Sequence, residues 1–304
     1  MVDWIVNMYQ IQAREESGDA VKRVIVEEID SVIALLTDPE GDQDLAVHES
    51  RKSLKRIRAA LRLVRAEIGE EVFGHENAVY RDTGRQIAIL RDSAVMVETL
   101  DLIRTQNEAS LTAESFELVR QRLVEKKEET RQNFLRQTAF IPNMVETLAE
   151  ACERVAGLPI QHQDFRAYEG GLRRVYQRGR LWMARAYQDG NSPQKFHEWR
   201  KRVKYTWHHI EFLQPLWPAL FETLANEMHQ LSDYLGEAHD AAVLAAYIQE
   251  NKGDFADEPE LVSLLTMLSE RQQALEVTAQ PLGRRLYAER PKAFVERLSA
   301  YWKR

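Results

Sequence analysis

The strongest constraint on the fold is an internal repeat. The segment "HESRKSLKR" beginning at His48 recurs as "HEWRKRVKY" beginning at His197, 149 residues later. Downstream, "LRDSAVM" from Leu90 is matched by "AHDAAVL" from Ala238, at an offset of 148 residues. Matches in the same order at nearly one offset predict a tandem duplication of a unit of about 150 residues. We therefore expect a first repeat over residues 1–156 and a second over 157–304, packed on each other with approximate two-fold symmetry.

Each repeat is expected to be helical. Apolar residues recur at three- and four-residue spacing, and no segment shows the alternation typical of a strand. The 304 residues include only 13 glycines and 9 prolines, which favours long helices over many short elements. The segment 157–164, "GLPIQHQD", is the predicted linker between the halves. The predicted helices include 19–36, 44–68, 76–103, 193–213, 218–250 and 259–279.

The composition also predicts where the protein resides. A single cysteine, Cys152, excludes an internal disulfide framework and suits a reducing cytosol. The longest aliphatic run, Ala241 to Ile248, is far shorter than the roughly 20 residues that cross a bilayer. The first residues, "MVDWIVNMYQIQAREE", lack the basic start and apolar run of a signal peptide. We therefore expect a cytoplasmic protein without a membrane partner.

The repeated segment carries an unusual concentration of positive charge. The chain has a formal net charge of −7, yet the 18 residues from His48 to Arg65 include seven Lys and Arg. A helix turns by about 100° per residue, so most of these cations share one face, opposite an apolar face. We call this face the first ridge. It consists of His48, Arg51, Lys52, Lys55 and Arg62.

The second repeat reproduces this arrangement in a second ridge. It consists of His197, Arg200, Lys201, Lys204 and His208. The segment "GLRRVYQRGR" adds a third strip, in which Arg173 and Arg180 lie two turns apart. Charged helix faces are usually solvated and mix both signs, whereas here like charges stack at a mild cost in stability. Because both repeats carry the same ridge, we predict an anion site, and two ridges facing one groove would suit a linear polyanion.

These motifs resemble a known family, the CHAD domain (conserved histidine α-helical domain). The resemblance rests on "HESRKSLKRIR" with "LRDSAVM", on "FHEWRKRVKY" with "LGEAHDAAVL", and on "GLRRVYQRGR" before the second histidine motif. It covers roughly residues 18–303. It implies two four-helix repeats that meet at a central basic groove or channel, where inorganic polyphosphate binds.

The resemblance also implies which residues contact polyphosphate. The residues that carry over are His48, Arg51, Lys52, Lys55, His197, Arg200, Lys201 and Lys204, together with Arg173 and Arg180. Two positions depart from symmetry between the repeats, because Tyr205 replaces Arg56 and Glu211 replaces Arg62. They imply an asymmetric site that is weaker at the second repeat.

Catalysis is not expected. Some relatives are fused to a triphosphatase module with the signature Glu-x-Glu-x-Lys, but here Glu258-Pro-Glu260 is followed by Val262 at the lysine position. No P-loop, His-Glu-x-x-His or Gly-x-Ser-x-Gly motif is present. We therefore expect a non-catalytic binding protein without a cofactor.

Metal and nucleic acid are the competing ligands. The histidines are surrounded by Lys and Arg, and that charge disfavours a metal ion. We expect Asp92 and Asp240, which occupy matched positions in the two repeats, to pair with basic side chains. The main alternative is the backbone of nucleic acid, or another phosphorylated ligand, because its phosphate groups attract the same residues. Against it, no recognition motif is present, and Trp199 and Trp207 beside the second ridge are expected in the core.

Overall fold

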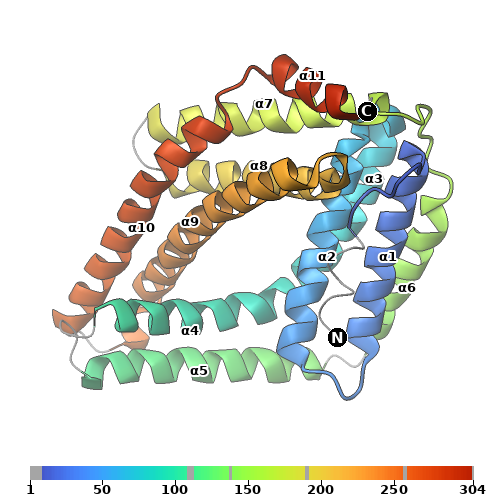
Figure 1. The fold of residues 1–304 in the computed structure, drawn as a ribbon. Helices are drawn as coiled ribbons and strands as arrows, with labels where there is room; N and C mark the ends of the chain where they lie inside the picture. Colours follow the sequence, from blue (N-terminus) through green and yellow to red (C-terminus); the bar gives the residue numbers. More distant parts are fainter. Residues whose placement is uncertain (1–8, 108–112, 137–138, 189–191, 256–258, 303–304) are drawn as a thin grey trace.

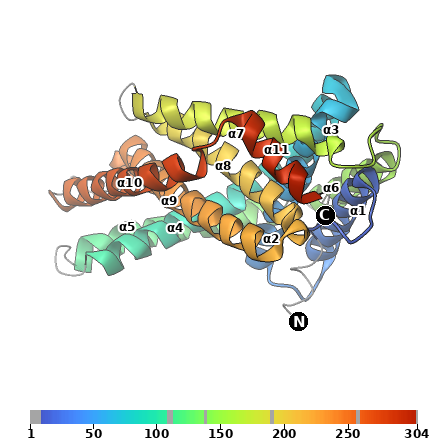
Figure 2. The same cartoon turned by 45° about the horizontal axis from the view of Figure 1, so that its top comes forward.

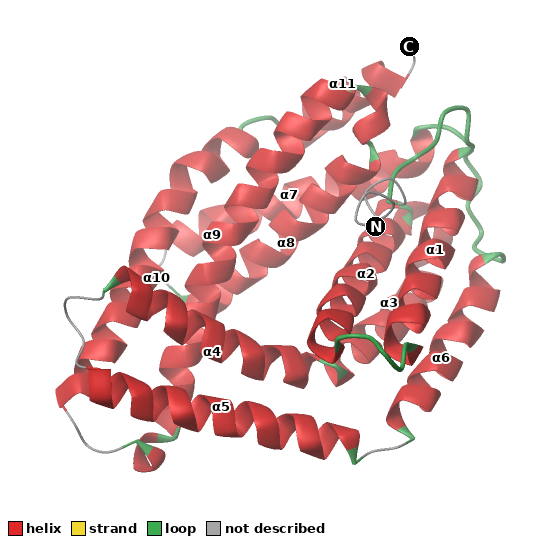
Figure 3. Ribbon diagram, turned by 60° about the horizontal axis from the view of Figure 1, so that its bottom comes forward, coloured by secondary structure: helices red, strands yellow, loops and turns green. Residues whose placement is uncertain are grey.

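The computed structural model describes residues 9–107, 113–136, 139–188, 192–255 and 259–302. Within these ranges the chain forms eleven α-helices, two short 3₁₀ helices and no strand (Figure 3), which confirms the predicted all-α class. The helices are α1 (Ser17–Thr37), α2 (Gln43–Leu63), α3 (Arg65–Gln86), α4 (Ala88–Gln106), α5 (Ala113–Leu135), α6 (Phe140–Val155), α7 (Arg166–Gln188), α8 (Pro193–Phe212), α9 (Pro218–Glu250), α10 (Pro259–Leu286) and α11 (Pro291–Trp302).

The helices form a frame around the centre of the molecule (Figure 1). Helix α2 packs between α1 and α3 on one side, while α8 packs against α7 and α9 on another. Helices α4 and α5 lie side by side and reach the far part of α9, which packs along α10. In Figure 2 these two pairs extend away from α1, α3 and α6. Their ends share a separate apolar cluster that includes Leu100, Leu123, Leu244 and Leu268, whereas the remaining helices share a larger core.

Three of the predicted helices have wrong boundaries. The helix predicted over 259–279 continues past Pro281 to Leu286 as α10. The helix predicted over 44–68 ends at Leu63, and α3 starts at Arg65 and kinks at Gly69, where φ is +80°. Glycine adopts this left-handed conformation readily because it has no Cβ. The helix predicted over 76–103 is also interrupted, because α3 ends and α4 begins on either side of Ile87. Periodicity continues across such kinks, so it does not reveal them.

Residues 157–164, the predicted linker, separate α6 from α7 without helical structure, and their role as a boundary between two repeats stays a prediction. Helices α1–α6 lie before this linker and α7–α11 after it. The repeated histidine motifs fall on α2 and α8, and their downstream partners fall on α4 and α9. The two-fold relation between repeats 1–156 and 157–304 remains a prediction.

Helices α2 and α8 are joined directly. The Nε2–H of His209 on α8 donates a hydrogen bond of 2.9 Å to the backbone oxygen of Ala59 on α2, and both residues are buried. Burial lowers the pKa of His209 to about 3, so the ring is neutral at pH 7. A small apolar contact of Ala59, Val175 and Tyr205 joins α7 to the same crossing.

A close approach between α7 and α2 fixes this junction further. A Cβ added to Gly171 on α7 would lie 2.0 Å from the backbone oxygen of Leu63 at the end of α2. No larger residue fits without separating the two helices. Within the described residues, each helix is too short or too polar to span a bilayer.

We expect Gly171→Ala to lower the free energy of unfolding by about 1–3 kcal/mol, because the added methyl group meets backbone that cannot move aside locally. The matched control is Gly74→Ala on α3, where an added Cβ has no neighbour within 4 Å. There the better helix propensity of alanine should leave stability unchanged or raise it by up to about 1 kcal/mol. Urea denaturation followed by circular dichroism measures both. Equal effects would show that α7 and α2 are not in close contact.

Candidate functional site

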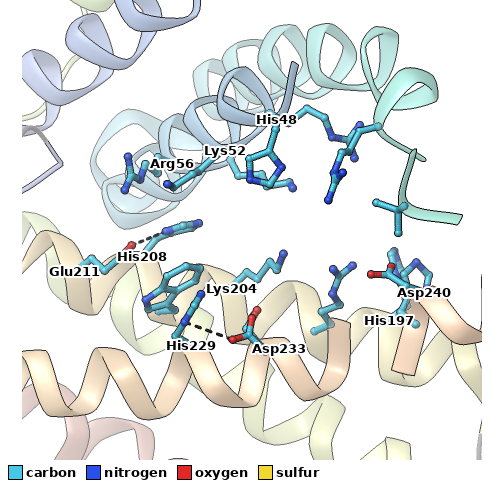
Figure 4. A pocket seen from close by; sticks show the side chains of 18 of the residues that line it. His48, Lys52, Arg56, His197, Lys204, His208, Glu211, His229, Asp233 and Asp240 are labelled. Carbon is cyan, nitrogen blue, oxygen red and sulfur yellow. Dashed lines mark hydrogen bonds and ion pairs between the residues drawn. The ribbon is translucent and has the colours of Figure 1, made fainter. Parts of the chain in front are cut away.

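The two ridges line a single cavity of about 750 Å³. Helix α2 forms one wall and α8 with α9 forms the opposite wall, so that His48 and Lys52 face Lys204 and His197 across the space (Figure 4). Helix α4 and the segment around Tyr9 complete the lining. Of the sequence-predicted contacts, the structure brings together His48, Arg51, Lys52, Lys55, His197, Arg200, Lys204 and His208.

The cavity is positively charged although the protein is acidic. Its lining contains seven Lys and Arg, four Asp and Glu and five His. With neutral histidines these side chains leave an excess of three positive charges, against −7 for the whole chain. Cations gathered between low-dielectric walls concentrate their field inside the space and attract anions.

The most buried cations of the lining repel one another. Burial lowers the pKa of Lys55 to about 8, with further lowering by Arg51 and Arg200. Burial also lowers the pKa of Lys204 well below its usual value, and Arg200 and Lys55 act in the same direction. Charges from α2 and α8 therefore meet in the space between the helices. An anion placed there would relieve this repulsion and raise the pKa values of both lysines.

Two aspartates partly neutralise this centre. An Asp92 oxygen on α4 lies 3.4 Å from Nη2 of Arg51, at the long end of an ion pair. Asp240 on α9 lies near Arg200 and Lys204, and burial raises its pKa. The sequence predicts that both aspartates pair with basic side chains. The structure shows this directly for Asp92, while Asp240 acts through its nearby charge.

The histidine end of the second ridge is also buried and incompletely bonded. The rings of His197 and His239 lie 4.4 Å apart, and burial lowers both pKa values, that of His239 to about 3. Within the described part of the chain, Nδ1 of His197 and Nε of Arg200 are buried without a hydrogen-bond partner. Buried polar atoms normally have partners. Nε of Arg200 can donate to an oxygen-rich ligand, and Nδ1 of His197 can do so in the tautomer that carries the proton there.

The other end of the cavity is aromatic and internally paired. His208 bonds Glu211 at 2.8 Å, and His229 lies 3.4 Å from Asp233 (Figure 4). The ring of Trp207 lies between them, 4.8 Å from that of His208 and 4.4 Å from that of His229. The core prediction therefore holds for Trp199, which is 0% exposed, and only in part for Trp207, which packs against the core and also lines the cavity.

Two predicted contacts on the ridges lie outside the cavity. Lys201 on α8 pairs with Glu198 instead. Arg62 lies beyond the α2–α8 crossing, where its guanidinium stacks 4.0 Å from the Tyr205 ring and Nη1 donates to the backbone oxygen of Arg58. A helical wheel places Arg62 on the right face of α2 but gives no information on where α8 crosses that face.

The third predicted strip also lies outside the cavity. Arg173 is exposed on α7. Arg180 donates from Nη1 to the backbone oxygen of Glu289, which joins α7 to the segment before α11. Helix α7 packs on the side of α8 that carries Tyr205, so its basic strip does not reach the cavity.

Several lining residues were missed from the sequence. Arg91 on α4 and His239 on α9 precede Asp92 and Asp240 in the repeated downstream block, and that matched position was an available signal. Arg56 lay within the first basic segment but off its ridge. Tyr9 and His229 line the cavity only because the tertiary structure brings them there, and no sequence motif identifies either residue. Among the described residues, no three side chains of His, Cys, Asp or Glu converge as a metal site.

Comparison with known proteins agrees with this architecture. The CHAD domain family matches residues 31–249, which is most of the chain. The chain belongs to the CHAD family. Two solved structures have a similar fold. "PptA from Streptomyces chartreusis" matches with a TM-score of 0.64 and 13% sequence identity, and the match covers 90% of this chain and 100% of that one. The CHAD domain from the plant Ricinus communis matches with a TM-score of 0.57 and 15% identity, and the match covers 92% of this chain and 94% of that one. No curated protein matches the sequence.

We expect Lys55→Met to stabilise the free protein at pH 7. The folded pKa of about 8 lies below the ordinary value of 10.5, so protonated Lys55 destabilises the fold below pH 8 and this cost disappears as the pH rises to 10.5. The gain at pH 7 should be on the order of 1–3 kcal/mol and should shrink towards pH 10. Thermal melting across this pH range measures it.

The control for this variant is Lys126→Met on the exposed face of α5, which should change stability by less than about 0.5 kcal/mol. A lower melting temperature for Lys55→Met at pH 7 would mean that Asp92 and Asp240 fully neutralise Lys55. The positive charge in the cavity would then be structural.

Proposed function

We propose that this CHAD protein binds inorganic polyphosphate in the cavity between α2, α4, α8 and α9 without chemical turnover. The observation that carries the proposal is that the two basic ridges line opposite walls of one space. Their inner cations, Arg51, Lys55, Arg200 and Lys204, lie close enough to lower the pKa values of both lysines. Membership of the CHAD family supports the same ligand.

A linear chain of phosphates suits this arrangement. Its oxygens accept charge-assisted hydrogen bonds along the whole chain, and arginine can bind them through two donors at once. Arg200 supplies a buried donor, and His197 a buried ring nitrogen, that lack partners within the described residues. Bound phosphate would also raise the pKa values of Lys55 and of the histidines, so binding should be accompanied by proton uptake.

Binding rather than catalysis is the better account of the lining. The glutamate of the cavity, Glu211, is engaged by His208, and Asp92 by Arg51. Asp233 lies beside His229. These carboxylates orient or neutralise cations, which is the task of a binding site. The sequence also lacks the Glu-x-Glu-x-Lys signature of the triphosphatase module.

Nucleic acid fits the cavity less well. Single-stranded chains depend on open aromatic faces for stacking. Trp207, the tryptophan of the described cavity lining, already lies between the rings of His208 and His229. A base would have to displace one of these rings before it could stack.

The main test replaces Arg51 and Arg200 together by alanine. Long-chain polyphosphate should bind about 100-fold more weakly, since each charged contact contributes about 1.5 kcal/mol. Helicity should be kept, and melting should be unchanged or higher. The matched control, Arg122→Ala with Lys126→Ala on α5, removes the same charge from an exposed surface and should leave affinity within about threefold at 0.15 M salt, where surface charges are screened. Equal losses in the two variants would contradict a localised site.

A competition experiment separates polyphosphate from nucleic acid. Labelled long-chain polyphosphate is displaced by unlabelled polyphosphate, single-stranded DNA or double-stranded RNA at the same phosphate concentration and salt. We expect polyphosphate to compete at least tenfold better. If either nucleic acid competes equally or better at 0.15 M salt, nucleic acid becomes the preferred ligand.

A further inference from the structure

A second basic site lies outside the cavity, where the end of α2 and the start of α3 meet α7 and α8. The arginines that α2 and α3 contribute, and those that α7 contributes, are spaced by three or four positions, and residues at this spacing share one side of a helix. We call this site the arginine cluster. Its members are Arg58, Arg62, Arg65, Arg174, Arg178 and Arg202.

The cluster is separate from the cavity. Arg202 and Lys204 are two residues apart on α8, which is a rotation of about 200° and places them on opposite sides of the helix. Lys204 lines the cavity and Arg202 does not. On α7, Arg174 and Arg178 are one turn apart. Burial lowers the pKa of Arg178, and the nearby charges of Arg202 and Arg65 lower it further, while Glu198 acts in the opposite direction.

Acidic partners do not balance this charge. Within the described residues, the ion pairs of the six arginines go to two carboxylates. Glu70 is shared by Arg65 and Arg174, and Glu198 is shared by Arg202 and Lys201. Arg58, Arg62 and Arg178 have no ion pair among the described residues, so the six arginines share two carboxylates and the cluster carries a local positive excess.

The inner part of the cluster is buried and incompletely bonded. Arg202 has 15% of its side chain exposed, and its Nε is buried without a hydrogen-bond partner among the described residues. Burial, with the charges of Arg58 and Arg202, lowers the pKa of Arg62 to about 10. Like charges held this closely are costly unless an anion compensates them.

A purely structural role accounts for only part of the cluster. The guanidinium of Arg62 stacks on Tyr205 at 4.0 Å, and that of Arg65 stacks on Phe73 at 4.1 Å, so these two stabilise the junction as cation–π contacts. Arg178 has no such contact, and it lies exposed beside Arg202 at the outer side of the cluster.

We propose that the arginine cluster is a second anion site, which takes a compact phosphate oxyanion such as a diphosphate group between Arg178 and Arg202. Arginine forks bind such oxygens through two parallel hydrogen bonds. The anion comes either from a free diphosphate or from a segment of a longer polyphosphate. The site does not depend on binding in the cavity.

The test uses the full chain with the cavity disabled by Arg51→Ala and Arg200→Ala, titrated with pyrophosphate by calorimetry. We expect one remaining site. Adding Arg178→Gln and Arg202→Gln should weaken it at least tenfold, while Arg185→Gln, also an exposed arginine of α7, should have no effect. Absence of pyrophosphate binding to the cavity variant, or equal binding after the Arg178 and Arg202 substitutions, would overturn the proposal.

A second measurement covers the case in which the combined variant does not fold. The single variant Arg178→Gln changes an exposed side chain, and it alone should weaken pyrophosphate binding severalfold. In the unsubstituted protein, the side-chain Nε–Hε resonance of Arg202 should shift on titration with pyrophosphate. A resonance that stays unchanged at saturation would also overturn the site.

Long-chain polyphosphate distinguishes the two sources of the anion. If Arg178→Gln with Arg202→Gln weakens long-chain binding to the protein with an intact cavity, the cluster holds a segment of that polymer. If only pyrophosphate binding is lost, the cluster takes a free diphosphate. Failure of the proposed cavity function would give a different result. The affinity for long-chain polyphosphate would then be unchanged by Arg51→Ala with Arg200→Ala, while pyrophosphate would still bind at the arginine cluster.

Discussion

The crossing of α2 and α8 is the constraint on which the rest of the structure depends. Here the neutral ring of His209 donates to the backbone of Ala59, and Gly171 lets α7 approach the end of α2. The crossing fixes how the two basic helices face each other. On one side of α8 their ridges line the cavity, and on the other the arginine cluster forms around Arg202. Both basic sites therefore depend on the same buried contact.

Positive charge held in this way opposes folding and favours binding. Burial and like-charge repulsion lower the pKa of Lys55 to about 8, and that cost is part of the free energy of the unliganded protein. Proteins commonly keep such strain at functional sites because a ligand relieves it. The acidic remainder of the chain limits anion binding elsewhere, since its net charge of −7 repels phosphate from ordinary surfaces.

Sequence reasoning was accurate for local features and failed where distant segments meet. The helical class, the linker at 157–164 and the faces carrying His48 and His197 all follow from periodicity and repetition. The kink at Gly69 and the break at Ile87 were missed because the apolar pattern runs through both. Arg62 was assigned to the first ridge correctly by angle, yet it lies beyond the crossing and stacks on Tyr205.

The sequence by itself determined that this chain is helical, that its two halves repeat a basic motif, and that Arg51, Lys55, Arg200 and Lys204 lie on faces opposite the core. These properties depend on a spacing of three or four residues, which the helix converts directly into direction. Only the tertiary structure decided that α2 and α8 present those faces to one cavity, that α4 and α9 add Asp92 and Asp240, and that Arg62 and Arg202 gather elsewhere. The reason is physical: electrostatic interactions depend on distances of a few ångströms between helices, and those distances are set by how the buried faces pack.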